Sequence, residues 1–348
     1  MDTLSFGWNE FHARNFESFA RDFVPARVCA QHRQLYRVLS PAGELVAAVS
    51  GRLRQLAAGP QDFPAVGDWV AIRLRVAERR ATIHHVLPRR TEFTRQAAGR
   101  NVAEQVLAAN VDSVFVMAGL DGDFNLRRLE RYLIAAWESG AQPVIVLNKA
   151  DLCDDVAGRI LLAEAVAPGT PVHAISSVDG YGLDDLAAYL TPGHTVALLG
   201  SSGVGKSTLI NRLLGTERQP TRAVLSGDSR GRHTTTSREL IPLPGGALVI
   251  DTPGLRELQL WSAEDGMDAA FADVTELAAQ CRFHDCRHRD EPGCAVRDQL
   301  DPARLANYHK TQRELDFLAR RQDVHARLAE KQRWKAIHKA MRDMDKRR

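Results

Sequence analysis

Residues 200–207 read Gly200-Ser201-Ser202-Gly203-Val204-Gly205-Lys206-Ser207 and match the pattern G-x-x-x-x-G-K-[ST]. An apolar run, Val196–Leu199, precedes them, and the segment that follows can open a helix. This arrangement is typical of a phosphate-binding loop, in which glycines let backbone N–H groups turn inward at a helix N-terminus. We expect the loop and the adjacent Thr208 to bind the phosphates of a nucleotide. Lys206 would reach the β- and γ-phosphates, and Ser207 would ligate Mg²⁺.

A second motif, D-x-x-G, begins at Asp251 and ends at Gly254, directly after the apolar run Leu248–Ile250. An acidic side chain at the tip of such a strand can hold Mg²⁺, and the Gly254 amide can contact the γ-phosphate. D-x-x-G alone often marks a plain turn. Its position, 44 residues after Ser207 and behind a strand-like run, favours a role in the same nucleotide site.

A third motif, Asn148-Lys149-Ala150-Asp151, fits N-K-x-D and follows the apolar run Pro143–Leu147. The Asp151 carboxylate can accept hydrogen bonds from guanine N1–H and the 2-amino group together. Adenine offers neither donor at that edge, so the motif predicts guanine. The alternative is that Asp151 caps the N-terminus of a helix.

Ser176 and Ser177 follow the apolar run Val172–Ile175 and are the weakest of the four elements. They either contact guanine O6 through the backbone or cap the next helix. All four elements lie at the carboxyl ends of expected parallel strands, which is where an open α/β sheet binds ligands. Their agreement carries more weight than any one match.

The order of the motifs is unusual. In a Ras-like GTPase the phosphate-binding loop comes first and N-K-x-D comes late. Here N-K-x-D and Ser176-Ser177 precede residues 200–207, and D-x-x-G comes last. The same pocket forms if the chain is circularly permuted. An ATPase is a poor alternative while the guanine-selecting motif stands.

The pattern of apolar and polar residues changes along the chain. Up to about residue 100, an amphipathic stretch at Glu10–Phe23 is followed by short strand-like runs separated by turn signals. These runs are Ala26–Val38, Leu45–Leu53, Val66–Val76 and Ala81–Leu87. So few short strands must close on themselves to hide their edges, which favours a small barrel of the OB type. From residue 101 apolar runs, Ser113–Ala118 the first of them, alternate with helical patterns such as Leu126–Glu138, as in a doubly wound sheet.

Three cysteines and a histidine lie within 14 residues of one another: Cys281, Cys286, His288 and Cys294. This set matches a closed tetrahedral zinc site that leaves no position open for catalysis. His284 is a rival ligand, and a redox switch made of clustered thiolates is an alternative. We therefore expect three domains: an OB-like barrel at 1–100, a permuted GTPase domain at 101–262, and a helical zinc-binding domain with a basic tail at 263–348.

Composition limits the remaining possibilities. The 348 residues are 44% hydrophobic and 26% charged, which is ordinary for a globular chain long enough for several domains. No window approaches 18 consecutive apolar residues, and the N-terminus lacks a secretory pattern. With five unevenly spaced cysteines, the chain suits a reducing compartment. We expect a cytoplasmic monomer that does not contact a membrane.

The net charge of +3 is unevenly distributed. Residues 303–348 hold 14 basic and 6 acidic side chains, whereas the rest of the chain is mildly acidic. A basic tail of this kind is either a solvated helical face or a surface for a polyanion such as RNA. Arg89 and Arg90, with Phe93 and Arg95 nearby, are candidates to extend a basic surface from the barrel.

With these motifs together, the sequence resembles the RsgA family of circularly permuted GTPases, whose activity depends on the small ribosomal subunit. The resemblance covers nearly the whole chain and includes the stretch Gly231-Arg232-His233-Thr234-Thr235-Thr236. It implies hydrolysis of GTP to GDP and phosphate, Mg²⁺ bound with GTP, one structural Zn²⁺, and action late in small-subunit assembly. It further implies binding to ribosomal RNA, stimulation of hydrolysis by the subunit, and His288 rather than His284 as the zinc ligand.

The water-orienting group is the least determined part of the site. Leu255 stands where Ras-like enzymes place a glutamine, and leucine cannot orient water. The resemblance implies a catalytic role for His233; the alternative is a loop histidine with no chemistry. Thr234, Thr235 and Thr236 compete for contact with Mg²⁺, and we favour Thr235. Two alternatives for the whole chain stay open, namely a GTP-gated RNA-binding assembly placeholder and a permuted GTPase that serves another ribosomal particle.

Overall fold

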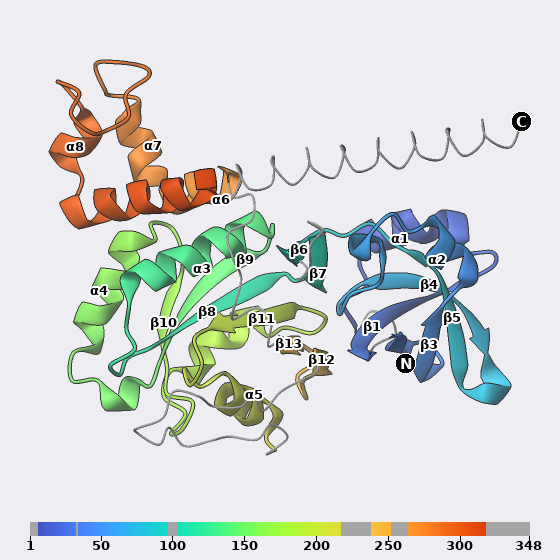
Figure 1. The fold of residues 1–348 in the computed structure, drawn as a ribbon. Coiled ribbons are helices and arrows are strands. Elements are labelled where there is room, and N and C mark those ends of the chain that lie inside the picture. The colour runs from blue at the N-terminus through green and yellow to red at the C-terminus, as the bar shows by residue number, and fades with distance from the viewer. Residues whose placement is uncertain (1–5, 33, 97–103, 217–237, 252–263, 318–348) are drawn as a thin grey trace, which may run out of the picture.

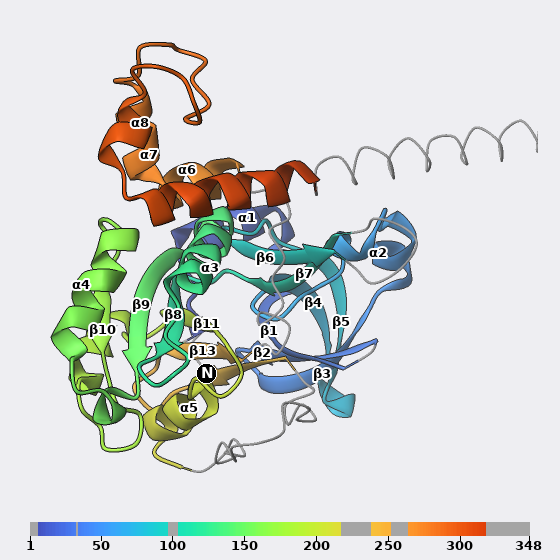
Figure 2. The same ribbon diagram turned by 60° about the vertical axis from the view of Figure 1, so that its left-hand side comes forward.

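The computed structural model describes residues 6–32, 34–96, 104–216, 238–251 and 264–317. The N-terminal part is a barrel, the middle part an α/β sheet, and the C-terminal part a group of helices that packs on the α/β part (Figures 1 and 2). This arrangement confirms the expected multi-domain α/β fold class. Among the described residues, none of the helices combines the length and apolar character that a membrane span requires.

The barrel is built from five strands. They are β1 (Val24–His32), β2 (Leu35–Ser40), β3 (Gly43–Val49), β4 (Trp69–Arg75) and β5 (Arg80–Val86). Neighbours follow the order β1-β2-β3-β5-β4, and β4 pairs with β1 to close the ring. Only the β3–β5 pairing is parallel. Closure hides every strand edge, which is why such short strands are stable. The shorter helical elements of this part are α1 (Glu10–Phe16), η2 (Glu17–Phe19), α2 (Gly51–Leu56), η3 (Pro60–Asp62) and η4 (Val76–Glu78).

Two of the expected barrel strands have different limits in the structure. The run Ala26–Val38 is two strands, because the end of β1 pairs antiparallel with the start of β2, His32 with Leu35. The run Leu45–Leu53 leaves the sheet after Val49, because Ser50 caps helix α2 by accepting a hydrogen bond from the Leu53 amide at 3.1 Å.

The α/β part contributes six strands, in the order β10-β9-β8-β11-β13-β12, to an eleven-stranded sheet that continues into the barrel where Glu239 of β12 pairs with Ala30 of β1. Its strands are β8 (Ser113–Gly119), β9 (Gln142–Asn148), β10 (Val172–Ala174), β11 (Thr195–Gly200), β12 (Glu239–Pro242) and β13 (Leu248–Asp251). All neighbours are parallel except β12 and β13. The central neighbours β8 and β11 are about 80 residues apart in the chain, as the permuted motif order requires.

Helices cover both faces of this sheet. They are α3 (Leu126–Glu138), η5 (Ala150–Leu152), α4 (Val156–Val166), η6 (Leu183–Tyr189) and α5 (Lys206–Leu214). Alternate residues of β8 point to opposite faces: Val114 and Val116 belong to the core shared with α3, whereas Phe115 and Met117 pack with α5. A strand buried on both faces reads as a continuous apolar run, which explains why these strands could be predicted.

A hairpin joins the barrel to the α/β part. Its strands are β6 (Glu92–Gln96) and β7 (Glu104–Ala109), which pair antiparallel and form a separate two-stranded sheet. A boundary drawn at residue 100 therefore falls inside this hairpin. The C-terminal part consists of α6 (Glu264–Ala270), α7 (Ala272–Ala278), α8 (Ala295–Gln299) and a helix at residues 302–317. Helix α6 lies against α3, where the α-carbon of Gly266 is so close to the Ile134 carbonyl that a Cβ would come within 2.6 Å of it.

Candidate functional site

The loop at residues 200–207 connects β11 to α5 and surrounds the end of the Lys206 side chain. Gly203 and Gly205 have φ values of +81° and +102°, which only glycine adopts without strain. The Lys206 ammonium donates hydrogen bonds to the carbonyls of Gly200 and Ser201 at 2.6 and 2.5 Å. Lys206 itself is only 6% exposed. This is the geometry of a phosphate-binding loop at the N-terminus of a helix.

Asn148 joins three of the sequence motifs. Its side-chain amide donates to the Val204 carbonyl of the phosphate-binding loop at 2.8 Å. Its side-chain oxygen accepts from the Ser177 amide at 3.0 Å and from the Ser177 hydroxyl at 2.9 Å. A Cβ at Gly205 would lie 2.2 Å from the Asn148 side-chain nitrogen, so a glycine is required there. Segments that are 29 and 56 residues from Asn148 are thus bonded into one site.

The remaining guanine-side residues lie on the turns that follow β9 and β10. Lys149 has a left-handed backbone, with φ +67°, and directly precedes the short helix η5, on which Asp151 is exposed. Ser176 is fully buried, and its hydroxyl accepts a hydrogen bond from the Asp179 amide at 3.3 Å. It therefore shapes the loop that presents Ser177.

The structure describes only some of the residues that we expect near Mg²⁺ and the γ-phosphate. Ser207 and Thr208 are half-buried in the first turn of α5, and Asp251 is buried at the end of β13, which pairs parallel with β11. Parallel pairing puts Asp251 and the phosphate-binding loop at the same edge of the sheet. His233, Thr234, Thr235, Thr236, Gly254 and Leu255 lie outside the described residues.

A loop that the sequence motifs did not indicate also reaches this site. Residues 120–125 follow β8 and contact both the N-K-x-D segment and the phosphate-binding loop through Asp121 and Asp123. Partial burial favours the neutral form of Asp121, but hydrogen bonds from Lys149 and from the Asp123 amide hold the pKa of this carboxyl below its ordinary value. In the sequence, the Asp121-Gly122-Asp123 segment shortly after an apolar strand could have indicated this loop.

The Cys/His cluster is assembled in the C-terminal part. One ligand atom from each of Cys281, Cys286, His288 and Cys294 lies within 4.8 Å of all the others. His288 Nδ1 is 3.7 Å from the Cys281 sulfur and 3.5 Å from the Cys294 sulfur. His284, the rival ligand, is exposed and is not part of the group. This donor set could hold a metal ion.

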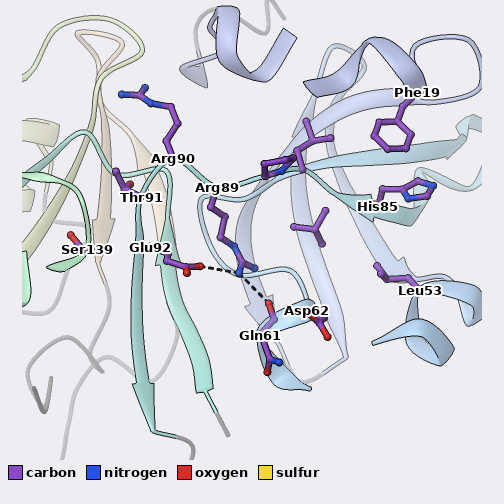
Figure 3. Close-up of a pocket in the computed structure, with 13 residues that line it drawn as sticks. Phe19, Leu53, Gln61, Asp62, His85, Arg89, Arg90, Thr91, Glu92 and Ser139 are labelled. Carbon is purple, nitrogen blue, oxygen red and sulfur yellow. Dashed lines mark hydrogen bonds and ion pairs between the residues drawn. The ribbon is translucent and has the colours of Figure 1, made fainter. Parts of the chain in front are cut away.

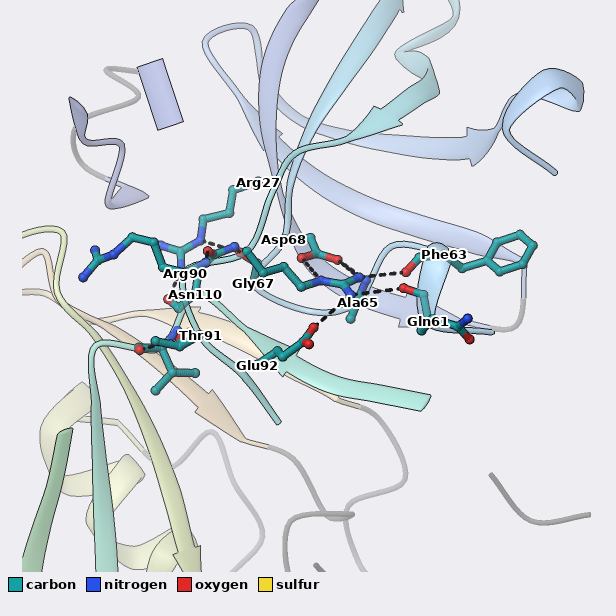
Figure 4. A network of polar contacts seen from close by, with 12 residues as sticks. Arg27, Gln61, Phe63, Ala65, Gly67, Asp68, Arg90, Thr91, Glu92 and Asn110 are labelled. Atoms are coloured by element: carbon teal, nitrogen blue, oxygen red, sulfur yellow. Dashed lines mark hydrogen bonds and ion pairs between the residues drawn. The ribbon is translucent and has the colours of Figure 1, made fainter. Parts of the chain in front are cut away.

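Arg89 and Phe93 are not available for the basic surface expected around them. The Arg89 guanidinium pairs with the fully buried Asp68 at 2.8 Å and also with Glu92 at 3.1 Å. It donates to the carbonyls of Gln61 and Phe63 as well, so all of its N–H groups are engaged. Figure 3 labels Arg89, and Figure 4 labels the residues that accept from it. Phe93 is 2% exposed. Arg89 is a structural residue of the barrel, and sequence alone could not show that its partners fold over it.

The neighbouring Arg27 links the barrel to the α/β part. It is 1% exposed and donates to the carbonyls of Gly67 at 3.2 Å and of Asn110 at 3.0 Å (Figure 4). It also donates to the Phe6 carbonyl. Burial lowers the pKa of Arg27 to about 10. A cavity of about 600 Å³ opens beside this junction, between Phe19 and His85 of the barrel and Ser139 at the end of α3 (Figure 3). None of the motif residues lines that cavity.

The fold and the site together define a circularly permuted P-loop GTPase. The sequence model of the RsgA GTPase family matches residues 86–261, and the chain belongs to that family. As a member it is a GTP-hydrolysing enzyme. A second model, that of the ABC transporter, matches residues 183–341, which include the phosphate-binding loop.

Individual relatives agree with the family. The chain is 52% identical to the small ribosomal subunit biogenesis GTPase RsgA of Opitutus terrae, over 98% of this chain and 97% of that protein. It is 49% identical to the small ribosomal subunit biogenesis GTPase RsgA 2 of Lactiplantibacillus plantarum, over 84% of each chain. Among solved structures, YjeQ from Thermotoga maritima is similar with a TM-score of 0.64 and 26% identity, covering 84% of this chain and 98% of that one.

Proposed function

We propose that this enzyme acts in late maturation of the small ribosomal subunit and that binding to the subunit stimulates its hydrolysis of GTP. GTP binding is supported by one observation above all, the hydrogen bonds of Asn148 to both Val204 and Ser177. These bonds hold the guanine and phosphate motifs next to each other. The names of the two relatives above support the partner.

Within this site we assign the contacts by residue chemistry. The Asp151 carboxylate would read guanine, with Lys149, Ser176 and Ser177 beside the base. The amides of residues 200–205 and the Lys206 ammonium would stabilise the phosphate charge as water attacks in line. When Mg²⁺ is bound with GTP, it would be held by Ser207, Asp251 and Thr235, and the Gly254 amide would contact the γ-phosphate. His233 is our candidate for orienting the water, because Leu255 cannot.

The three expected domains, at 1–100, 101–262 and 263–348, stay our proposal. A closed ring of barrel strands, a run of mostly parallel strands and a helical core around Phe271 support it, and these parts are joined by the β1–β12 pairing and by Ile134 of α3. We propose that the barrel, the metal module and the basic tail bind ribosomal RNA, and that the protein works in the cytoplasm, where ribosomes mature. The alternative is a GTP-gated placeholder on RNA for which hydrolysis is incidental.

Phosphate release from GTP, measured with and without purified small subunits, tests this function. We expect turnover to rise at least tenfold with small subunits and to change little with an equal concentration of large subunits, which serve as the control. Equal stimulation by both subunits would favour the alternative partner. No stimulation by either would contradict the proposed coupling.

We propose that the Cys/His cluster holds one structural Zn²⁺. Zn–S and Zn–N bonds of about 2.3 and 2.0 Å in a tetrahedron place a sulfur and a nitrogen about 3.5 Å apart. The distances from His288 Nδ1 to the two cysteine sulfurs, 3.5 and 3.7 Å, fit that geometry. With three thiolates and one imidazole as ligands, the ion would be closed to substrate and would act by holding the chain.

Removal of this metal should loosen the C-terminal helices. Cys281, Cys286 and Cys294 pack against the core that contains Phe271 and Val274, so loss of the ion exposes that core. We expect one zinc per chain by elemental analysis, and faster amide exchange in α7 and α8 after chelation, while β11 and α5 stay protected. Unchanged exchange in metal-free protein would show that the cluster has no structural role. The size of the effect should be several kcal/mol, since zinc-finger peptides derive roughly 10 kcal/mol or more from the metal.

A further inference from the structure

The loop at residues 120–125 lies between the two halves of the nucleotide site. It begins where β8 ends, and its first amide, that of Leu120, donates to the Asn148 carbonyl at 2.8 Å. It ends at Asn125, whose side chain caps α3 by accepting from the Arg128 amide at 3.0 Å. Both ends of the loop are therefore fixed to regular structure, and the two carboxylates between them have defined positions.

Asp121 is bonded to the lysine of the N-K-x-D motif. Its side-chain oxygen lies 2.5 Å from the Lys149 ammonium, and the two side chains are 30% and 20% exposed. The other oxygen of Asp121 accepts from the Asp123 amide at 3.1 Å, which fixes the carboxylate plane. A pair that is this well oriented and mostly shielded from water contributes more than an exposed ion pair does.

Asp123 is bonded to the other half of the site. It accepts a hydrogen bond from the Ser201 hydroxyl of the phosphate-binding loop and pairs with Arg128 of α3 at 2.7 Å. Two carboxylates, two residues apart in one loop, thus contact the guanine segment and the phosphate segment separately. Neither contact uses an atom that the motifs assign to the nucleotide, because the Lys149 stem and the backbone amides of the loop stay available.

Lys149 requires such a support. A non-glycine residue with φ +67° is strained by about 1 kcal/mol, and the alternative backbone would turn the following helix η5 away. Asp151 lies on η5, two residues later. The position of the Lys149 side chain therefore affects both the surface beneath the base and the carboxylate that reads its edge.

We propose that Asp121 is a positioning residue for guanine recognition, acting through Lys149. The 2.5 Å contact holds the lysine stem alongside the base-binding position and keeps the Asp151 turn in its binding conformation. This inference rests on the proposed guanine site. It assigns to the acidic loop after β8 a part in nucleotide affinity, although the carboxylate itself does not touch the nucleotide.

A double-mutant cycle with Asp121→Asn and Lys149→Met tests the inference, with the dissociation constant of fluorescently labelled GDP as the readout. Lys149→Met keeps the apolar stem and removes the ammonium. We expect Asp121→Asn to weaken GDP binding about five- to tenfold and Lys149→Met to weaken it at least as much. The double variant should bind within twofold of Lys149→Met, because the second change removes a partner that is already lost.

Two controls complete the design. Asp154→Asn makes the same charge change on an exposed carboxylate close to Asp151 and should leave GDP affinity within twofold. The thermal midpoint of Asp121→Asn should stay close to that of the unmodified chain. An unchanged affinity in Asp121→Asn would overturn the inference. The inference would also be overturned if the double variant weakened GDP binding by the product of the two single effects, because Asp121 would then act independently of Lys149.

The guanine site itself is tested separately by Asp151→Asn. An asparagine offers a donor where xanthine has a carbonyl, so this variant should lose GDP and gain xanthosine diphosphate. If Asp151→Asn makes that exchange but the effects of Asp121→Asn and Lys149→Met on GDP affinity are independent, the guanine site is supported and the proposed role of Asp121 is wrong. If the exchange does not occur, the proposed guanine site itself is wrong.

Discussion

Replacing Arg304 with Met should destabilise the C-terminal helices by about 3–5 kcal/mol, because it leaves a buried carboxylate without its cation. Arg304 and Glu130 pair across the contact between the C-terminal part and α3, with side chains only 7% and 4% exposed. The same guanidinium donates to Asp273 at 2.8 Å and to the Ala270 carbonyl at 3.0 Å. Asn307 donates to the second oxygen of Glu130. Urea unfolding followed by amide exchange in α6–α8 measures the loss.

The pH dependence of the stability of Arg304→Met tests whether the unpaired Glu130 carboxylate causes the loss. Burial raises the pKa of Glu130, although Arg304 and Asn307 oppose the rise. A carboxyl with a raised folded-state pKa stabilises the fold below its ordinary pKa and loses that contribution as the pH rises through the folded value. Without Arg304 the rise is larger, so the deficit of Arg304→Met should be smallest near about pH 4 and should grow toward neutral pH. Adding Glu130→Gln should remove that dependence.

Arg131→Met is the matched control for this prediction. Arg131 pairs with Glu314 across the same contact at 2.9 Å, but the two side chains are 43% and 33% exposed. An exposed pair of this kind contributes about 0–1 kcal/mol, so this variant should remain close to the unmodified chain. Equal losses in the two variants would contradict the importance we give to burial.

The strands of the nucleotide-binding part could be predicted from sequence because burial on both faces makes them continuous apolar runs. Val196–Leu199 and Leu248–Ile250 are examples, and helix α3 has the expected limits, Leu126–Glu138, with Gly140 just beyond its end at φ +78°. Because ligands bind at the carboxyl ends of parallel strands, the motifs were expected at one edge of the sheet. The hydrogen bond from Asn148 to Val204 agrees with that expectation.

What could not be predicted depends on contacts between distant residues. Glu130 and Arg304 are 174 positions apart, and each alone has the sequence character of a solvated charge. Arg89 was expected to be open to a polyanion for the same reason, whereas it pairs with the buried Asp68. The strands β6 and β7 were missed because each is short and both lie where the chain passes from barrel to sheet, so no long alternation marks them.

Replacing Lys206 with Ala should lower subunit-stimulated GTP turnover by roughly 10²–10³-fold, the range found when one preorganised donor to a developing charge is removed. The Lys206 ammonium is held inside the phosphate-binding loop by the carbonyls of Gly200 and Ser201, so its position is set before the reaction. Preorganisation of this kind lowers the barrier without a reorganisation cost at the moment of reaction. Single-turnover phosphate release, with small subunits in excess, measures the effect.

The control for this last change is Arg212→Ala, which removes an exposed cation from the last turn of the same helix α5. Its guanidinium donates to the Asp179 carbonyl at 3.3 Å, which belongs to the loop after β10 and not to the phosphate-binding loop. General weakening of α5 or loss of surface charge would affect both variants, whereas loss of phosphate stabilisation affects Lys206→Ala alone. Turnover of Lys206→Ala within threefold of the unmodified enzyme would mean that another cation performs this role.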